Sequence, residues 1–487
     1  MTSPHLGSRP SRQPDSSRIS AAAAAHGIDA NLLVATLREL GQVERLDDLG
    51  QGGPLLASAG RDSLFHCLFG RDAIRMAFDL LEDFPAVARA TLVELARLQG
   101  VGYNARADEE PGRILHEHRL DDDVLLPGLL HTWSFPYYGA VDSTPQWIAL
   151  LAEYVAQEGD TVLRTQVVDR LGRTVTLLDS LCAALGWLLG RLDDPSGGGY
   201  LWVRRASPDG IANQVWEDSS DSYYHADGAL FDFTRPYAPV AVQGYTYDAL
   251  LGAADVLETC QRHSPPPSLP TGDSAASGVC RPLGIASLRR RAADLRARTF
   301  RDFWQPDLGT FALALTFDGP ADGSDGHLAQ GRPARVAASS PGHLLASQLL
   351  DGGDAENVRE RLIARLFEPD LLAGAGIRTR STTAPRFRPG SYHNGSTWPM
   401  DTGVIADGLR RHGYLVLAQD LEARILRGCA LVGGFPELFR GEEDGSIALN
   451  TATIDVVQDG AVNRLEQPPQ PFQGWTATRV WRILRRG

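Results

Sequence analysis

The chain has few cysteines, no long apolar segment and no excess of basic charge. Its five cysteines are scattered without a CxxC pair, which favours reduced thiols over a disulfide framework or a zinc site. No run of about eighteen apolar residues exists that would span a membrane. A net charge of −13 argues against nucleic acid or an anionic membrane as partner, since both require clustered lysine and arginine. These absences predict a cytoplasmic protein.

At 487 residues the chain has room for one large domain or a few ordinary ones. Its start is rich in serine, proline and arginine and ends in Ala21–Ala25, without the longer apolar core of a secretory signal. We therefore expect a disordered tail over residues 1–28 and one folded domain over residues 29–487.

Helical periodicity dominates that domain. Helices are expected at about 29–47, 72–83, 85–100, 143–157, 160–190, 240–264, 285–304, 341–352, 355–368, 400–413, 415–432 and 472–485. Period-two strand patterns are few and short, at 199–203 and 309–316.

The connections between these helices alternate between short and long. The long ones are 48–71, 101–142, 191–239, 305–340, 369–399 and 433–471. Loops above about fifteen residues are uncommon and usually functional. Helical hairpins with all long loops at one end predict an all-α fold, an (α/α)6 toroid with one concave mouth. The Pro/Ser-rich segment 265–284 is expected as a surface excursion on the opposite side.

The loop 191–239 carries the most distinctive polar sequence, Asn213-Gln214-Val215-Trp216-Glu217-Asp218-Ser219-Ser220-Asp221. A tryptophan ring suits the face of a sugar, and an acid held partly desolvated beside it stays protonated and can act as a general acid. Taken alone, such a run of acids is more typical of a solvated loop.

Two other loops hold comparable groups. Arg71-Asp72 offers donors beside an acceptor for vicinal hydroxyls, or else a helix cap with a surface arginine. Tyr138 and Asp142 suit a sugar ring and its hydroxyls, although Asp142 serves equally well as a cap. His116-Glu117-His118 lacks HExxH spacing, and adjacent strand residues face opposite ways, so no metal site is expected.

The last two long loops add aromatic groups and an acid. Tyr392, His393 and Trp398 stand close together in the sequence, and burying them is costly unless their polar atoms are satisfied. Glu437 is an acid in an otherwise apolar run. It belongs either to a site or to an ion pair with Arg440.

Together these motifs resemble the amylo-α-1,6-glucosidase (glycogen-debranching-like) family of six-hairpin glycosidases, related in fold to glucoamylase and trehalase. The matching stretches run in order along the chain: FGRDAI (69–74), EPGRILHEHR (110–119), YYGAVDSTP (137–145), NQVWEDSSDS (213–222), HADG (225–228), VQGYTYDA (242–249), SSPGHLL (339–345), GIRTRS (376–381), SYHNGSTWPMD (391–401) and FPELFRG (435–441).

The resemblance implies an inverting hydrolase. One acid protonates the glycosidic oxygen while a second carboxylate, about 6.5–9.5 Å away, activates water on the opposite face. The implied general acid is Asp218 and the implied general base is Glu437. The implied substrate-binding residues are Arg71, Asp72, Glu117, Tyr138, Asp142, Trp216, Gln243, Tyr392, His393 and Trp398.

The chain also departs from the family pattern. Members often carry an N-terminal β-rich domain, for which residues 1–68 are too short, so contacts from it are not expected. The usual QGWKDS has Glu217 in place of lysine, whose like charge would favour the protonated form of Asp218. LPELFCG has become FPELFRG with Arg440, and CSPQAW survives only as Gln473-Gly474-Trp475.

We therefore expect an inverting, exo-acting α-glycosidase that needs neither metal nor cofactor. It would hydrolyse a terminal α-glucosyl residue of an oligosaccharide, a glycogen-type limit dextrin or a small glucoside. Alternatives are a hydrolase of a disaccharide or compatible-solute glycoside, a non-hydrolytic (α/α)6 sugar epimerase relying on His116, His225 or His393, and a glycan-binding protein. A carbohydrate is the expected partner, and nothing in the sequence indicates an oligomeric state.

Overall fold

The computed structural model describes residues 16–60, 63, 65–119, 134–263, 284–317, 330–449, 452–458, 461–467 and 469–486. Within them the chain is rich in helices, as the periodicity predicts. The α-helices that agree with expectation are α2 (Ala30–Leu40), α3 (Gly70–Leu80), α4 (Pro85–Arg97), α6 (Ser143–Glu158), α8 (Val240–His263), α9 (Ile285–Phe303), α10 (Glu356–Leu366), α11 (Pro399–Arg411), α12 (Leu415–Val432) and α13 (Gly474–Arg486).

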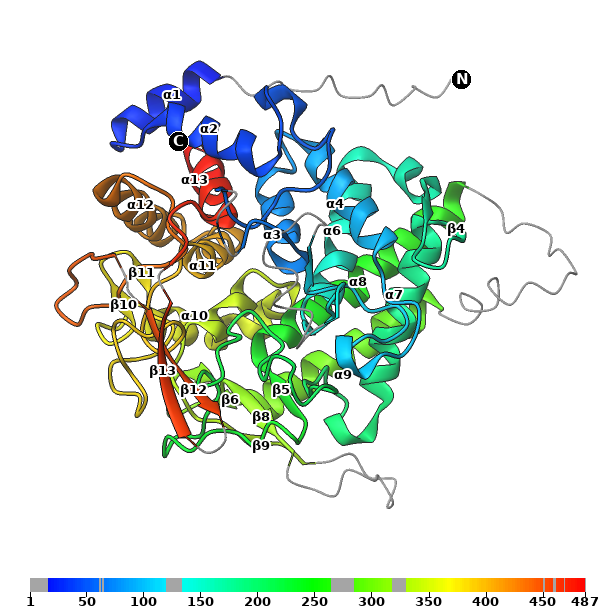
Figure 1. The fold of residues 1–487 in the computed structure, drawn as a ribbon. Coiled ribbons are helices and arrows are strands. Elements are labelled where there is room, and N and C mark those ends of the chain that lie inside the picture. Colours follow the sequence, from blue (N-terminus) through cyan, green and yellow to red (C-terminus); the bar gives the residue numbers. More distant parts are fainter. Residues whose placement is uncertain are drawn as a thin grey trace, which may run out of the picture.

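Six elements close a ring by packing side by side (Figure 1). In order they are α3, α6, α8, the 3-10 helix η5 (Ser340–Leu345), α11 and α13, and α13 packs back onto α3. A second layer covers this ring: α4 packs on α3 and α6, α9 on α8, α10 on η5, α12 on α11 and α2 on α13. Helix α7 (Leu177–Asp193) packs on α4 and α6. Because α11 and α13 are buried almost throughout, the ring is the inner layer.

Backbone pairings link the long loops in a second circle at one end of this ring. Strand β1 (Leu68–Phe69) joins β2 (Glu117–His118), Val141 donates to the carbonyl of Gln214, and β5 (Tyr237–Pro239) joins β8 (Ala314–Thr316). The circle continues through the bridges Ala338–Arg380 and Thr397–Phe439 and closes with Ser58–Gln473. Each long loop therefore contacts the next, as loops around one mouth must.

The other strands are short hairpins or edge additions. They are β3 (Gln166–Val168) with β4 (Thr174–Thr176), β6 (Trp304–Gln305) with β7 (Thr310–Phe311), β9 (Arg332–Pro333) beside β8, β10 (Leu372–Ala373) with β11 (Gly376–Ile377), and β12 (Ala452–Gln458) with β13 (Ala461–Gln467). All these pairs are antiparallel.

Buried ion pairs hold the closing point of the ring. Arg479 on α13 lies 2.8 Å from Asp79 on α3 and 2.5 Å from Asp407 on α11. The Arg479 side chain is only 5% exposed. A buried guanidinium is tolerable when carboxylates and hydrogen bonds satisfy it, so one arginine connects three inner helices.

Several elements differ from the expectation. The segment 160–190, expected as one helix, contains the 3-10 helix η3 (Asp160–Arg164), the β3–β4 hairpin and then α7. Gly172 adopts a φ of +75° at the hairpin turn, and Thr176 forms a capping box with Asp179 that begins α7. Residues 199–203 contribute one bridge, from Val203 to Tyr237, rather than a strand.

The fourth inner element is also shorter than the expected helix over 341–352. Two 3-10 helices, η5 and η6 (Gln348–Leu350), replace it. The Ser347 side chain accepts the N–H of Leu349 and so starts a separate turn. A Cβ on Gly342 would lie 2.9 Å from Ile405 of α11, so the close approach of the two elements requires this glycine.

The N-terminal segment contains a helix where the sequence suggested a tail. Helix α1 (Ser16–Ala25) packs on α2 and α13 and buries Ile19 and Ala23. Ile19 is 4% exposed and Ala23 is fully buried. Residues 1–15 lie outside the described residues.

The cysteines differ from the expectation of reduced thiols throughout. Cys182 is disulfide-bonded, whereas Cys67, Cys260 and Cys429 are free. Structural disulfides are typical of oxidising compartments, so the cytoplasmic location stays a prediction with one observation against it. In the part of the chain that the structure describes, no helix is both long and apolar enough to cross a membrane.

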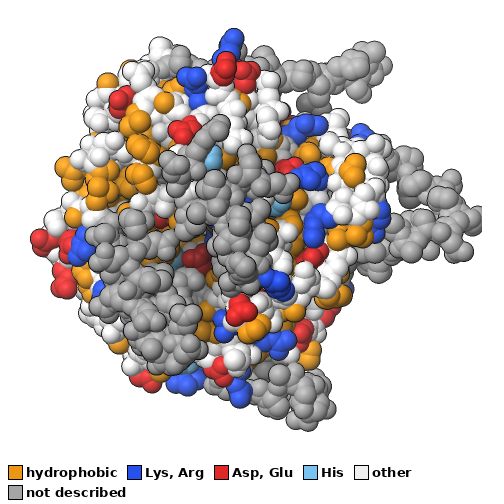
Figure 2. Space-filling model, viewed as in Figure 1, with side chains coloured by type: hydrophobic (Ala, Val, Ile, Leu, Met, Phe, Trp, Pro, Cys, Tyr) orange, Lys and Arg blue, Asp and Glu red, His pale blue; other side chains and the backbone are white. Residues whose placement is uncertain are grey.

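The visible face of the molecule has mixed charge (Figure 2). Acidic and basic side chains are interspersed on it, and hydrophobic side chains gather over α12.

Candidate active site

The first turn of α3 presents Arg71 and Asp72 at the loop end of the ring. Pairing of β1 with β2 fixes the backbone just before this turn. A Cβ on Gly70 would lie 2.2 Å from the carbonyl oxygen of Leu115, so the approach of the loop requires glycine here. The N-cap of α3 is Phe69, not Asp72, and the side chain of Asp142 makes no cap hydrogen bond to α6. Both aspartates are therefore left for other partners.

Arg71 links two acids from different loops. Its Nε donates to Oδ2 of Asp142 at 2.9 Å, and its Nη1 lies 3.7 Å from Oδ2 of Asp218. Arg71 and Asp142 are buried, whereas the side chain of Asp218 keeps 29% of its surface exposed. Asp218 is thus the acid of this group that a ligand can reach.

Three carboxyls around this position have raised pKa values. Burial raises the pKa of Asp218 to about 6, with Arg71 opposing the rise and Asp142 adding to it. Burial likewise raises the pKa of Asp72 to about 7 and that of Glu437 to about 8, and Asp218 contributes to both. Because Asp218 acts on both of the other carboxyls, the three lie within electrostatic range of one another. There they retain protons that ordinary carboxyls lose well below neutral pH.

Glu437 is held by donors rather than by a cation. The hydroxyl of Tyr392 donates to Oε1 at 2.5 Å, and the N–H of Gln470 donates to Oε2 at 3.2 Å. Both bonds favour the ionised form against the effect of burial. Arg440 pairs with Glu442 instead, so the alternative of a Glu437–Arg440 ion pair is wrong.

An aromatic wall stands beside the acids. Trp216 stacks on His343 with 5.7 Å between ring centroids and meets His393 and Trp398 edge to face. His393 in turn stacks on Trp398 at 4.9 Å, and Tyr392 packs edge-on against both of them. These five rings are buried and fix one another, which makes this part of the site rigid.

His393 is a neutral hydrogen-bond donor. Burial holds its pKa well below the usual value, and the charges of Arg380 and Arg71 act in the same direction. The backbone N–H of Ser219 donates to Nδ1 at 3.3 Å, which makes Nδ1 an acceptor. The ring hydrogen therefore sits on Nε2, which is buried without a partner among the described residues.

Other buried polar atoms of this region also lack a partner within the described chain. They are Arg71 Nη2, Asp142 Oδ1, Trp216 Nε1, Asp401 Oδ2, Gln473 Oε1 and Trp475 Nε1. Unsatisfied buried donors and acceptors cost free energy, and natural proteins have few of them. A concentration of both kinds around three carboxyls indicates a site completed by a hydroxyl-rich ligand.

Some residues expected in the site have other roles. The hydroxyl of Tyr138 donates to the carbonyl of Leu98 at 2.6 Å, deep in the core. The amide of Gln243 bonds the backbone of Leu201 in both directions and the carbonyl of Pro239. Neither side chain keeps an atom for a ligand, so both hold the loops in place.

Glu117 and His116 lie beside the start of α3. Nε of Arg119 donates to Glu117 at 2.5 Å, and His116 packs edge-on against Phe69 and Tyr137. These contacts do not bring Glu117 to Asp218 or Glu437. In the described ranges no group of three or more His, Cys, Asp or Glu side chains has the arrangement of a metal site.

The structure adds residues that the sequence did not single out for the site. Nε2 of Gln473 donates to Oδ2 of Asp72 at 3.0 Å; its signal was the remnant Gln473-Gly474-Trp475. His343, which stacks on Trp216, bonds Oδ1 of Asp401 through Nε2 at 2.7 Å. No spacing in the sequence indicates that this pair forms.

Glu217, which was expected to act on Asp218 through its charge, is bonded to two other side chains. Arg380 and the hydroxyl of Tyr223 engage its two carboxylate oxygens, and the residue is fully buried. Burial and Asp142 raise the pKa of Asp218. Because Glu217 is charge-paired with Arg380, an effect of its like charge on Asp218 stays a prediction.

Comparisons with known proteins support a glycoside hydrolase. Residues 281–448 match a family model described as the mannosylglycerate hydrolase MGH1-like glycoside hydrolase domain. A solved GH63 mannosylglycerate hydrolase from Thermus thermophilus, in complex with Tris and D-glycerate, matches with a TM-score of 0.53 and 14% sequence identity, over 93% of this chain and 99% of that chain. An uncharacterized conserved protein of the same organism matches with a TM-score of 0.50 and 14% identity, over 93% and 98%. No curated protein matches the sequence.

These findings support a glycoside hydrolase with a fold of the six-hairpin glycosidase group. At this level of identity the solved structures bear on the fold alone. They support this broader group, and not specifically the amylo-α-1,6-glucosidase or glycogen-debranching type that the sequence motifs suggested.

Proposed function

We propose that this chain is an inverting, exo-acting glycoside hydrolase built on an (α/α)6 toroid and acting on a small glycosylglycerate-type glycoside. The observation that carries the proposal is the convergence of Asp218 and Glu437, from separate loops, on one cluster. Tyr392 bonds Glu437, the adjacent His393 accepts the N–H of the residue after Asp218, and buried polar atoms around them lack a partner among the described residues. The matched family model and the fold neighbour are both described as mannosylglycerate hydrolases, which favours a compact substrate over a dextrin. Mannose and glucose are the two sugars to compare.

In this mechanism Asp218 is the general acid and Glu437 the general base. Asp218 gives its proton to the glycosidic oxygen as the bond to the anomeric carbon breaks. Glu437 takes a proton from water as that water adds to the same carbon from the opposite face. The products are a free sugar of inverted anomeric configuration and the free aglycone alcohol.

The raised pKa values determine which of the two acids holds the proton at neutral pH. With values of about 6 for Asp218 and about 8 for Glu437, the dominant form at neutral pH has the proton on Glu437. The productive form, with the proton on Asp218, is then a minor species of the same total charge. Tyr392 and Gln470, which favour the ionised form of Glu437, increase its population.

Proton NMR of the purified protein with a panel of glycosides tests the proposal. The panel is α-mannosylglycerate, α-glucosylglycerate, maltose, isomaltose, trehalose and a debranching limit dextrin. We expect the β-anomer of the sugar to appear first, from one of the glycerate glycosides. Release of the α-anomer would refute inversion, and turnover of the dextrin alone would refute the compact substrate.

The contacts of the three candidate histidines do not support the alternative of a sugar epimerase. Of its three candidate histidines, His116 packs between two aromatic rings, and His393 is a neutral residue already engaged by Ser219. His225 packs against Phe231, which also contacts Tyr223.

A further inference from the structure

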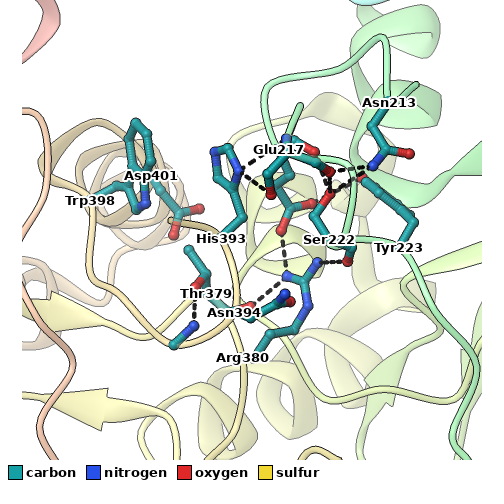
Figure 3. A network of polar contacts seen from close by, with 12 residues as sticks. Asn213, Glu217, Ser222, Tyr223, Thr379, Arg380, His393, Asn394, Trp398 and Asp401 are labelled. Atoms are coloured by element: carbon teal, nitrogen blue, oxygen red, sulfur yellow. Dashed lines mark hydrogen bonds and ion pairs between the residues drawn. The ribbon is translucent and has the colours of Figure 1, made fainter. Parts of the chain in front are cut away.

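One residue before Asp218, a buried ion pair joins two of the site loops (Figure 3). Glu217 and Arg380 have fully buried side chains, and Nη1 of Arg380 donates to Oε1 of Glu217. The hydroxyl of Tyr223 donates to Oε2 of Glu217 at 2.9 Å. The pair is therefore hydrogen-bonded as well as charge-paired, which a buried pair requires.

Arg380 also binds the backbone of the segment that follows Asp218. Its Nη2 donates to the carbonyl of Ser222, whose Oγ donates to the carbonyl of Glu217 at 2.6 Å. Arg380 thus holds both ends of the short turn that carries Asp218.

Further contacts from the Arg380 side reach the middle of this turn. Nδ2 of Asn394 donates to the carbonyl of Asp221 at 3.0 Å, and Nδ1 of His393 accepts the N–H of Ser219. All these partners come from residues 380–394. One loop therefore holds the backbone on both sides of the acid.

The carboxyl of Asp218 is itself weakly tethered. Its distance of 3.7 Å to Arg71 exceeds that of a hydrogen bond. The direction in which Asp218 points is therefore set by the backbone of residues 217–222, and this backbone is set by Arg380.

We propose that Arg380 and Glu217 are positioning residues that aim Asp218 at the glycosidic oxygen. The proposal rests on the proposed function for the role of Asp218. It assigns a function to a buried pair that would otherwise be structural and exchangeable for apolar residues.

The test compares Arg380→Lys, Glu217→Gln and the charge-neutral double variant Glu217→Gln/Arg380→Met. Either single change leaves a buried charge with a poorer partner and could destabilise the fold. The double variant removes both charges and therefore controls for misfolding. Arg410→Lys is the matched control, because Arg410 forms a bidentate pair with Glu422 between α11 and α12. Kinetics are measured on the glycoside that the wild type hydrolyses and on its 2,4-dinitrophenyl analogue, whose leaving group needs little protonation.

If Arg380 positions the acid, kcat/KM of the variants falls at least about tenfold more on the natural glycoside than on the activated one. The Arg410→Lys control changes both by the same factor. Equal losses on both substrates in the double variant would overturn the proposal and leave a structural pair.

A crystal structure of the double variant gives a readout that does not depend on activity. We expect the turn 217–222 to shift and the Asp218–Arg71 distance to change. An unmoved Asp218 would overturn the positioning role. Inactivity of the wild type on every substrate would instead contradict the proposed function, so the two failures are distinguishable.

Discussion

At the scale of single residues, the two acids differ in what surrounds them. Asp218 is partly exposed and faces a cation at 3.7 Å, whereas Glu437 is 4% exposed and bonded to a phenol and an amide. An acid that delivers a proton to a ligand must be reachable, and a base that activates water must be fixed. The environments therefore fit the roles assigned above.

Substitution of each acid should separate these roles. Asp218→Asn should lose about 10²–10⁴-fold in kcat/KM on the natural glycoside and far less on a dinitrophenyl glycoside, because the latter needs little protonation. Glu437→Gln should lose activity on both, since water attack is common to them. The measurement is kcat/KM of the two variants on both substrates. The opposite pattern would exchange the roles.

The hydrogen bond from Tyr392 gives a second, independent test. This bond lowers the pKa of Glu437, so Tyr392→Phe should raise that pKa above about 8. If Glu437 is the base, its stronger hold on the proton reduces the productive form near neutral pH.

The kcat/KM profile of Tyr392→Phe should then show a lower maximum and an alkaline limb moved to higher pH by a matching amount. At pH values above both limbs, the variant and the wild type should converge. If the alkaline limb moves to higher pH while the maximum of kcat/KM is unchanged, Glu437 is the general acid and not the base.

At the scale of elements, the periodicity of the sequence predicts most helices and the alternation of loops. It fails at 160–190 because the β3–β4 hairpin is apolar enough to continue a helical pattern, and only Gly172 and the Thr176 cap interrupt it. It fails at 341–352 because Ser347 restarts the turn locally. Both misses come from local turn-forming residues, such as Gly172 and Ser347, that compete with a weak helical preference.

The sequence also predicts only part of the site, namely the residues that are unusual in their own loop. Trp216, His393, Trp398 and the two acids are visible as unusual residues in long loops. The partner of Glu217 is not, because Arg380 lies 163 positions away and no local pattern marks it. Gln470 contributes a backbone N–H, for which the side chain gives no signal.

The N-terminal helix α1 gives a prediction at this scale. Ile19 is buried against the domain, so Ile19→Ala should lower the free energy of unfolding by about 2 kcal/mol. A disordered segment would show no effect. Urea unfolding measures the change, and Ala24→Gln on the exposed face of the same helix is the control.

At the scale of the whole molecule, two circles are superposed: the inner ring of helices and the circle of paired loops. The ring is closed by Arg479 with Asp79 and Asp407, far in sequence from one another. The loop circle carries the acids. Stability and the site therefore depend on different sets of buried charges.

The stability of the protein should reflect both sets. The buried carboxyls Asp72, Asp218 and Glu437 have pKa values of about 7, 6 and 8, above those of the unfolded chain. Between pH 5 and 8 the folded protein thus binds protons that the unfolded chain has released, and the free energy of unfolding falls as pH rises. Asp407 acts in the opposite direction, because the nearby arginines hold its pKa below the usual value despite burial. Its contribution is present above the ordinary carboxyl range and is lost on further acidification.

These opposing slopes predict a stability maximum at about pH 4, in the range where the carboxyls of the unfolded chain titrate. Glu437→Gln removes one titrating group and should make the fall from pH 5 to 7 shallower by up to about 1.4 kcal/mol per pH unit. Urea unfolding of the wild type and the variant at several pH values measures these slopes. The exposed acid Asp47, changed to Asn, controls for the loss of a carboxyl. Identical slopes in wild type and Glu437→Gln would show that Glu437 is ionised throughout this range, and its proton would then play no part in the pH dependence of the site.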